Sequence, residues 1–440
     1  MPLNRRLNLG DALLLIVGNV IGAGIFTTSG FLAGELPHPW LFLGIWLLGG
    51  LLTICGALSY AELAGMYPLA GGDYQYLKAA YGRWAAFLLG WVLFWVINPG
   101  SIAALAIGLV SYLGLLMPGL TAAQGKLLAV AVILGFSFIN HRGLRLSGTT
   151  QNLFTLGTLL TLLVFIAAGL GSGAGSWQHL SAAGLPAVSP AKLFATPMIA
   201  VIFTYSGWFA AAYVGSEVSN PQRNLPLALI LGTLCVTATY LLVNLVYLYA
   251  LPMERLHGAV NVAQLAMEIL YGPAVAGLVS LPIMLAIAAG INATILTGAR
   301  VSFAMGEDGL FWSRFRRVHC DYGTPSWALL CQCLLSCLLV LLGTFNQLLG
   351  YVVFVMLLSS VASGLALFIL RYRCPGQPRT YRTWGYPVVP LLFIAAYLWI
   401  AVQICWATPG TSLLGILIAL SGLPYYLWRK KRLQVQWAGG

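Results

Sequence analysis

The chain has 440 residues, of which 60% are apolar and only 7% are charged, and its formal net charge is +12. This composition excludes an ordinary soluble domain and places the chain among polytopic membrane proteins. The surplus of positive charge needs a separate explanation, which the distribution of Lys and Arg along the chain provides.

Apolar runs of about 20 residues, the length that spans a bilayer, follow one another along the chain and predict twelve membrane-spanning helices. The predicted fold class is therefore an all-α membrane protein. The predicted spans lie at roughly 11–34, 40–63, 84–113, 123–140, 148–170, 193–218, 226–250, 272–304, 326–343, 348–370, 387–407 and 411–428. The polar residues before the first span lack a cleavage site behind an apolar core, so this span is expected to stay in the mature protein rather than leave as a signal peptide.

Lys and Arg set the expected orientation, because they are enriched in cytoplasmic loops. All but Lys126, Lys192 and Arg255 fall on the face that holds the N-terminus, so both termini are predicted to be cytoplasmic in a multi-pass protein of the cell membrane. Because these charges are assigned to short loops beside the membrane, membrane lipid is an expected partner and nucleic acid is not.

The first span contains Gly22 and Gly24 within an apolar stretch. Glycine inside a helix costs about 1 kcal/mol relative to alanine, so this pair favours an unwound turn. In a membrane such a turn is found where it lines a cavity. The N–H groups that start the next half-helix suit a carboxylate, and the freed carbonyls before it suit an ammonium group. The alternative is that both glycines only allow close helix packing.

The segment that joins the second and third spans carries two acids, Glu62 and Asp73, at the predicted cytoplasmic rim. Ion pairs with Lys78 or Arg83 are expected there. Further on, Asn98-Pro99-Gly100 is expected to kink the third span.

Enzymatic activity is not expected, because all ten acids and all five histidines are assigned to rims, loops or span ends, which leaves no titratable group at the midplane. Cys331 and Cys333 recur within one predicted helix, where this spacing splits them across two faces, so no metal site is predicted. No structural disulfide and no cofactor are expected either. An ion channel stays as an alternative, although a channel would not require two broken helices, the one in the first span and the one in the sixth span described next.

A second interruption, Phe203-Thr204-Tyr205-Ser206-Gly207-Trp208, lies near the middle of the sixth span, which runs antiparallel to the first. Two interrupted spans, each the first of a group of five, predict an inverted-repeat transporter with its site at the midplane. The predicted units are 1–170 for spans 1 to 5, 171–370 for spans 6 to 10, and 371–440 for spans 11 and 12 with the C-terminus.

Several motifs resemble those of the amino acid/polyamine/organocation superfamily, and most closely those of bacterial relatives of the L-type amino-acid transporters. They are Gly22-Ala23-Gly24-Ile25-Phe26, the Gly56 to Leu63 stretch with Gly71-Gly72-Asp73-Tyr74, Asn220-Pro221-Gln222-Arg223-Asn224-Leu225-Pro226, and Arg379-Thr380-Tyr381-Arg382 before Gly385-Tyr386-Pro387. The resemblance covers nearly the whole chain. It implies the five-plus-five inverted repeat of the LeuT-like fold, with alternating access around broken spans 1 and 6.

The resemblance also implies a substrate site. Its carboxylate-binding groups would be backbone atoms of Ile21, Gly22, Ala23, Gly24 and Ile25, which also help to hold the amine, and carbonyls around Phe203, Thr204 and Ser206 would complete the ammonium site. Phe203 matches the aromatic gate on the outer side, although without the motif a packed aromatic residue in a helix would be the preferred interpretation. Neutral L-amino acids are predicted, because a cationic substrate would need a buried acid. The substrate side chain is expected among Gly207, Phe203 and spans 3, 8 and 10.

Two departures from the family pattern matter. No cysteine occurs between Leu116 and Lys126, where animal members link to a glycoprotein, so no disulfide-linked heavy chain is expected. In the fifth span, Thr158 occupies the position where several members place a lysine, and in the eighth span Asn292 offers one oxygen where a sodium site would need two ligands. Exchange or facilitated diffusion is therefore predicted, with proton-coupled symport as the alternative.

Overall fold

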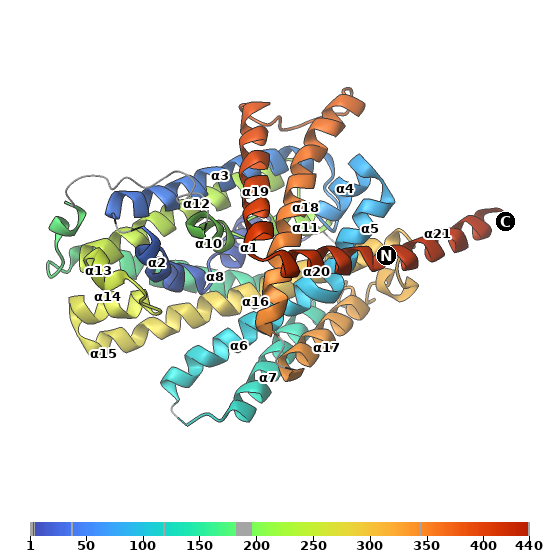
Figure 1. Ribbon diagram of the computed structural model, residues 1–440. Coiled ribbons are helices and arrows are strands. Elements are labelled where there is room, and N and C mark those ends of the chain that lie inside the picture. Colours follow the sequence, from blue (N-terminus) through green and yellow to red (C-terminus); the bar gives the residue numbers. More distant parts are fainter. Residues whose placement is uncertain are drawn as a thin grey trace.

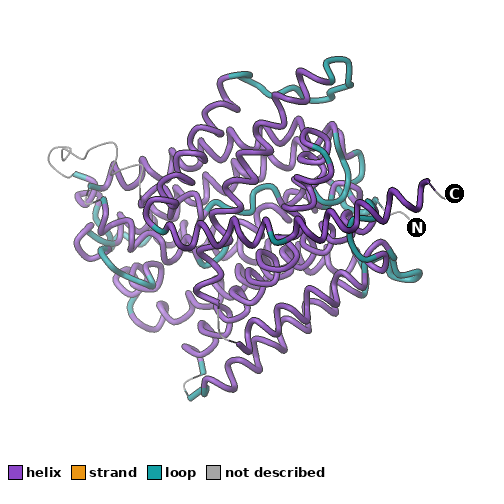
Figure 2. Tube along the Cα trace, turned by 45° about the vertical axis from the view of Figure 1, so that its right-hand side comes forward, coloured by secondary structure: helices purple, strands orange, loops and turns teal. Residues whose placement is uncertain are grey.

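The computed structural model describes residues 3, 5–36, 38–117, 119–181, 196–342 and 345–438. Helices make up most of this part of the chain, which contains no strand and only two isolated β-bridges. Long helices run side by side along the molecule, and both termini lie at the same end of it (Figures 1 and 2). Lys192 and the first residues of the predicted span 193–218 lie outside the described residues.

The helices have the following bounds in chain order. They are α1 (Leu9–Val20), α2 (Gly24–Glu35), α3 (Pro39–Met66), α4 (Asp73–Tyr81), α5 (Arg83–Val92), the π-helix η1 (Leu93–Ile97), α6 (Asn98–Leu116), α7 (Ala122–His141), α8 (Leu144–Gly171), η2 (Trp177–Leu180), α10 (Thr196–Thr204), α11 (Ala210–Tyr213), η3 (Gly215–Glu217), α12 (Pro221–Ala250), α13 (Met253–Leu256), α14 (Val262–Tyr271), α15 (Pro273–Ala276), η4 (Gly277–Val279), α16 (Ser280–Glu307), η5 (Ser313–Arg316), α17 (Ser326–Leu342), α18 (Phe345–Arg373), α19 (Val388–Ala407), α20 (Pro409–Leu420) and α21 (Gly422–Ala438).

Within the described residues, nine helical segments are long and apolar enough to cross a membrane, and the bent pair α1 and α2 would be a tenth. Shorter helices, α10 and α17, occupy the remaining predicted spans 193–218 and 326–343. The class of all-helical membrane protein is therefore confirmed, whereas the number of twelve spans stays a prediction. Where a kink is predicted in the third span, a π-helical turn, η1, ends at Ile97, and α6 begins at Asn98 directly before Pro99.

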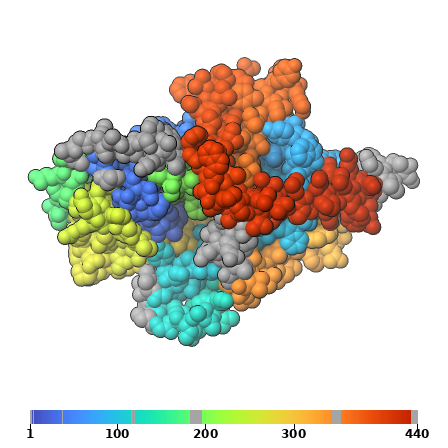
Figure 3. Space-filling view, in the orientation of Figure 1, coloured from blue at the N-terminus to red at the C-terminus, as the bar shows by residue number. Residues whose placement is uncertain are grey.

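The centre of the bundle is formed by α1 together with α8, α12 and α16, which pack against it. The start of α1 is fixed by a capping box, in which Asn8 and Asp11 each bond the other's backbone N–H through their side chains. The C-terminal helices α19 to α21 cover one face of the molecule, visible at the front in Figure 3. These central helices hold the first break at the core of the bundle.

The acids at the end of α3 and the start of α4 have partners other than those predicted. Glu62 pairs with Arg371, whose Nε lies 2.9 Å from Oε1, and with Arg379. The prediction of a pair with Lys78 or Arg83 is wrong because α18 and the segment after it pack over the end of α3. Lys78 instead pairs with Asp308 at 2.6 Å.

Asp73 forms no ion pair within the described part of the chain, although one was predicted. The hydroxyls of Tyr213 and Ser363 donate to its carboxylate at 2.7 and 2.6 Å. Burial raises the pKa of Asp73 above its usual value, while these hydroxyls partly counteract that rise. This acid is therefore buried among neutral donors, close to the bundle interior.

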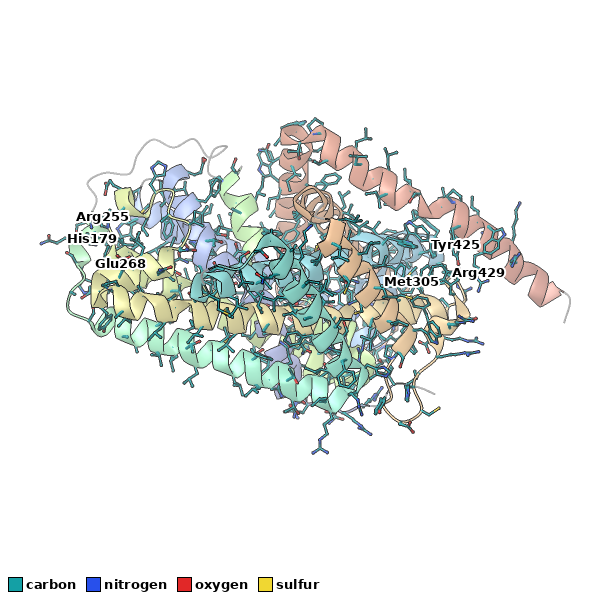
Figure 4. The ribbon with its side chains drawn as sticks, turned by 90° about the horizontal axis from the view of Figure 1, so that it is seen from below. His179, Arg255, Glu268, Met305, Tyr425 and Arg429 are labelled. Atoms are coloured by element: carbon teal, nitrogen blue, oxygen red, sulfur yellow. The ribbon has the colours of Figure 1, made fainter. Side chains whose placement is uncertain are left out.

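Arg300 was counted among the loop charges, and this assignment is wrong. It lies inside α16, and its fully buried guanidinium makes two hydrogen bonds to the equally buried carboxylate of Glu217, at 2.8 and 2.7 Å. Two charges can leave water together in this way because each compensates the other. Arg255, by contrast, lies at the far end of the molecule from Arg429, as its assignment to the opposite face predicts (Figure 4).

Candidate substrate-binding site

The two predicted interruptions lie side by side in the structure. α1 ends at Val20 and α2 begins at Gly24, with a bend of 43° between their axes. α10 ends at Thr204, and α11 begins only at Ala210. The Thr28 and Thr204 hydroxyls are 3.0 Å apart, so the half-helices that follow the first break and precede the second are in direct contact.

Gly207 and Asn19 join the two breaks from the other side. The Asn19 amide donates a 3.1 Å hydrogen bond to the Gly207 carbonyl. Gly207 has a positive φ of 97°, and a Cβ at this position would lie 2.6 Å from Asn19 Nδ2. Only glycine meets both requirements, the left-handed backbone and the close approach.

Tyr240 of α12 also connects the breaks, although it is not among the predicted site residues. Its buried hydroxyl lies 2.9 Å from the Val20 carbonyl, to which it donates, and 3.2 Å from the Thr204 carbonyl. The last carbonyls of α1 and α10 therefore share one donor. A buried tyrosine in an apolar span needs such a partner for its hydroxyl, and that need was the available sequence signal.

A cavity of about 290 Å³ lies against both breaks. This volume is at the small end of the roughly 300–1,000 Å³ range of ligand sites. Its wall includes Gly22, Ala23, Gly24, Phe203, Thr204, Ser206 and Gly207. Further wall residues come from α6, α16 and α18, the helices of the third, eighth and tenth predicted spans; they include Asn98, Ser101, Thr294, Thr297, Met356 and Ser359.

Two of the predicted site residues, Ile21 and Ile25, have fully buried side chains that do not form part of the cavity wall. Only their backbones could serve a ligand, as the prediction has it. Phe203 is 46% exposed and lies between this cavity and a smaller apolar one that is also lined by Trp208 and Tyr397. Its ring therefore borders both cavities.

Thr158 and Asn292, the predicted coupling positions, are not in the cavity wall. Thr158 donates to the Phe154 carbonyl of its own helix. The Asn292 oxygen accepts from Asn140 at 2.8 Å, and the Asn292 amide donates to Gln151 at 2.8 Å. The Asn292 side chain therefore already takes part in a buried hydrogen-bond network, and its oxygen has one lone pair left for a cation.

The close approach of α8 to the first break is a further feature that was not predicted. Gln151 donates to the Thr155 hydroxyl at 3.1 Å, and both side chains lie so close to Gly18 that a Cβ there would overlap them. With Ser147, these residues recur every four positions on one face of α8. That periodicity of polar residues in an apolar span was the available signal.

The electrostatics of the cavity come from dipoles. The described residues that line it include no Asp, Glu, Lys or Arg. The first N–H groups of α2 have no partner within their helix and carry positive partial charge. The carbonyls of Phe203 and Thr204 each accept one hydrogen bond, from Ser206 N and from Tyr240, and each keeps a second lone pair. No group of three metal-binding side chains occurs in the parts of the chain that the structure describes.

The segment before α1 is tied to the segment after α11. The N–H groups of Arg6 and Leu7 both donate to the Glu217 carbonyl at 2.9 Å, and Ser219 N donates to the Leu7 carbonyl at 2.8 Å. The Glu217 side chain in turn binds Arg300 of α16. Hydrogen bonds therefore join the first, sixth and eighth predicted spans at the end of the molecule that holds the termini.

A small cavity without charged side chains among its described walls, placed at two helix breaks inside a bundle of apolar helices, is typical of a membrane transporter. Comparison with known proteins identifies which kind. The chain belongs to the amino acid permease family, part of the amino acid/polyamine/organocation superfamily, whose pattern matches residues 7–425.

Known relatives match nearly the whole chain. The serine/threonine exchanger SteT of Bacillus subtilis is 33% identical over 436 residues, 98% of each chain. The large neutral amino acids transporter small subunit 2 of Homo sapiens is 30% identical over 447 residues, covering 98% of this chain and 82% of that protein. The Asc-type amino acid transporter 1 of Homo sapiens is 28% identical over 458 residues, with 98% and 84% covered. All three are amino-acid transporters by name.

Proposed function

We propose that this protein transports neutral L-amino acids across the cell membrane by alternating access, as an exchanger or a facilitator. The observation that carries this proposal is the cavity at the two breaks, whose described walls offer helix-end dipoles and hydroxyls but no charged side chain. Relatives that are named for serine and threonine exchange and for large neutral amino acids support the same substrate class.

In this proposal the substrate carboxylate binds the N–H groups between Gly22 and Ile25, where the α2 dipole favours negative charge. The ammonium group binds backbone carbonyls of both breaks, at Ile21 in the first and at Phe203, Thr204 and Ser206 in the second. Both ends of a zwitterion are thereby stabilised without a charged side chain. Phe203 acts as the gate by turning over the bound side chain.

The walls of the cavity favour a neutral side chain on the substrate. An unpaired charge inside a membrane protein costs several kcal/mol, so a cationic substrate would need an acid beside its far end. The acid that approaches the cavity wall is Asp73, which donors on Tyr213 and Ser363 already surround. The side chain would instead lie against Gly207, Phe203 and the wall residues of α6, α16 and α18.

We also propose the finer architecture: twelve spans with five-plus-five inverted repeats in 1–170 and 171–370, followed by 371–440. The two breaks, one in the first span of each proposed repeat, support this arrangement. Both termini are proposed to be cytoplasmic, in line with the distribution of Lys and Arg. A disulfide-linked heavy chain is not expected, and that expectation stays a prediction.

Exchange is favoured over ion coupling by the groups at the coupling positions. Thr158 has no charge to exchange, and the Asn292 oxygen already accepts a hydrogen bond. One observation favours proton symport as the second candidate: Tyr213 lines the cavity and its hydroxyl bonds buried Asp73, whose pKa burial raises. A proton taken up by Asp73 would thus be separated from the substrate only by the Tyr213 side chain.

Purified protein reconstituted into liposomes tests the function. Uptake of a labelled neutral amino acid should rise strongly when the vesicles contain unlabelled amino acid, and should respond little to an imposed sodium or pH gradient. Concentrative uptake driven by a pH gradient and lost in Asp73→Asn would establish the proton symport alternative. Absence of amino-acid uptake under every gradient would refute transport of neutral amino acids.

A further inference from the structure

A second groove lies on the outside of the bundle, between α7 and α17, which are neighbours at the lower edge of Figure 1. Its volume is about 310 Å³, and it is separate from the substrate cavity. Phe138 of α7 and Trp327 and Leu330 of α17 form its apolar walls, and all three are more than one third exposed. α7 is long and apolar enough to cross a membrane and α17 is a shorter apolar helix beside it, so lipid tails would face this groove.

The groove lies at one end of both helices, because its lining includes the last residue of α7, His141, and the first of α17, Ser326. Two guanidinium groups stack on its aromatic walls there. Arg142 Cζ is 4.8 Å from the Phe138 ring centre, and Arg314 Cζ is 5.0 Å from the Trp327 ring centre. Both arginines are exposed, and Arg142 also stacks on the Tyr322 ring and donates a 3.2 Å hydrogen bond to its hydroxyl. The mouth of the groove therefore carries two guanidinium groups, while its walls are apolar.

The groove also contains a polar atom without a partner. The Ser137 residue is 8% exposed, and its hydroxyl has no hydrogen-bond partner among the described residues. The Cys333 thiol is close enough to interact with this hydroxyl, but a thiol is only a weak hydrogen-bonding group. An unpaired hydroxyl at membrane depth is unfavourable, so an acceptor on a bound molecule would stabilise this site.

We propose that this groove binds one anionic phospholipid from the leaflet on the side of the termini. An acyl chain would lie against Phe138, Trp327 and Leu330, and an ester carbonyl of the glycerol backbone would accept from Ser137. The phosphate would lie between Arg142 and Arg314, because guanidinium groups bind phosphate through paired charge-assisted hydrogen bonds. Basic pockets between membrane helices are known to hold anionic headgroups in this way. The inference is independent of which substrate the protein transports.

Native mass spectrometry of the purified protein with added phosphatidylglycerol or phosphatidylcholine tests the proposal. We expect the wild type to retain phosphatidylglycerol at least tenfold more strongly than phosphatidylcholine. Arg142→Ala with Arg314→Ala should remove this preference. Arg382→Ala, at an exposed arginine elsewhere, is the matched control and should retain it.

Two further measurements separate lipid binding from headgroup binding alone. Ser137→Trp, which fills the groove, should displace the lipid, whereas Leu153→Trp on an exposed position of α8 should not. Soluble glycerol phosphate should compete poorly, because it has no acyl chain. Equal retention of both lipids, unchanged retention in the double arginine variant, or full competition by glycerol phosphate would each overturn the proposal. The arginine variant keeps the test valid if Ser137→Trp fails to fold.

Discussion

The contact between the two half-helices makes Gly24 the most informative position to change. A Cβ on Gly24 would lie 2.9 Å from Thr204 Cγ2 and 3.2 Å from Thr204 Oγ1. Valine adds two further methyl groups and forces α2 away from α10. Overpacking of this kind costs about 1–3 kcal/mol, which would weaken amino-acid binding about 5- to 150-fold if the bound geometry requires the contact.

The assay is equilibrium binding of a labelled neutral amino acid to Gly24→Val in detergent, together with its melting temperature and its elution profile. Gly44→Val is the matched control, because Gly44 is exposed on α3 and no atom lies within 4 Å of its Cβ position. Gly22→Ala adds a second comparison. Its methyl group meets no atom within 4 Å, so it should leave the fold intact while reducing the space beside the break. Binding of wild-type strength in folded Gly24→Val would refute the assignment of the site.

Three other predictions concern charge. Glu217→Gln should destabilise the protein by about 3–5 kcal/mol, since it leaves Arg300 buried without its counter-charge. The double change Glu217→Leu with Arg300→Met should recover much of the lost melting temperature. Equal melting temperatures of Glu217→Gln and the wild type would contradict this prediction. Burial raises the pKa of Asp73, so the folded protein holds this proton more tightly than the unfolded chain, and the wild type should lose stability as pH rises above about 4. Asp73→Asn should lose less stability over the same pH range, and identical pH profiles of the two proteins would refute this. Arginine should displace labelled leucine far less well than leucine itself does, and equal displacement would show that the site accepts a cation.

The positions of both breaks followed from local sequence, because glycine acts on the backbone around it. Gly22, Gly24 and Gly207 each lie where an unwound turn was predicted. The partners that hold those turns did not follow. Tyr240 reaches Val20 across 220 positions of sequence, and only the packing of α12 against α1 brings them together.

Charge partners were harder to predict for the same reason. Glu62 and Lys78 are close in sequence, yet Glu62 binds Arg371 and Lys78 binds Asp308. A charged side chain at the rim pairs with whichever opposite charge the packed helices bring close to it, and here that depends on contacts among α3, α4 and α18. The burial of Arg300 depends in the same way on Glu217, which lies 83 positions earlier.

An experimental structure with bound L-leucine would show directly whether the unwound turn at Gly22 to Gly24 binds the substrate. We expect the carboxylate within hydrogen-bonding distance of the N–H groups that begin α2, and the ammonium group facing the carbonyls of Phe203 and Thr204. Leucine bound elsewhere, for example in the polar cavity beside Arg5 and Lys78, with the turn empty, would contradict it.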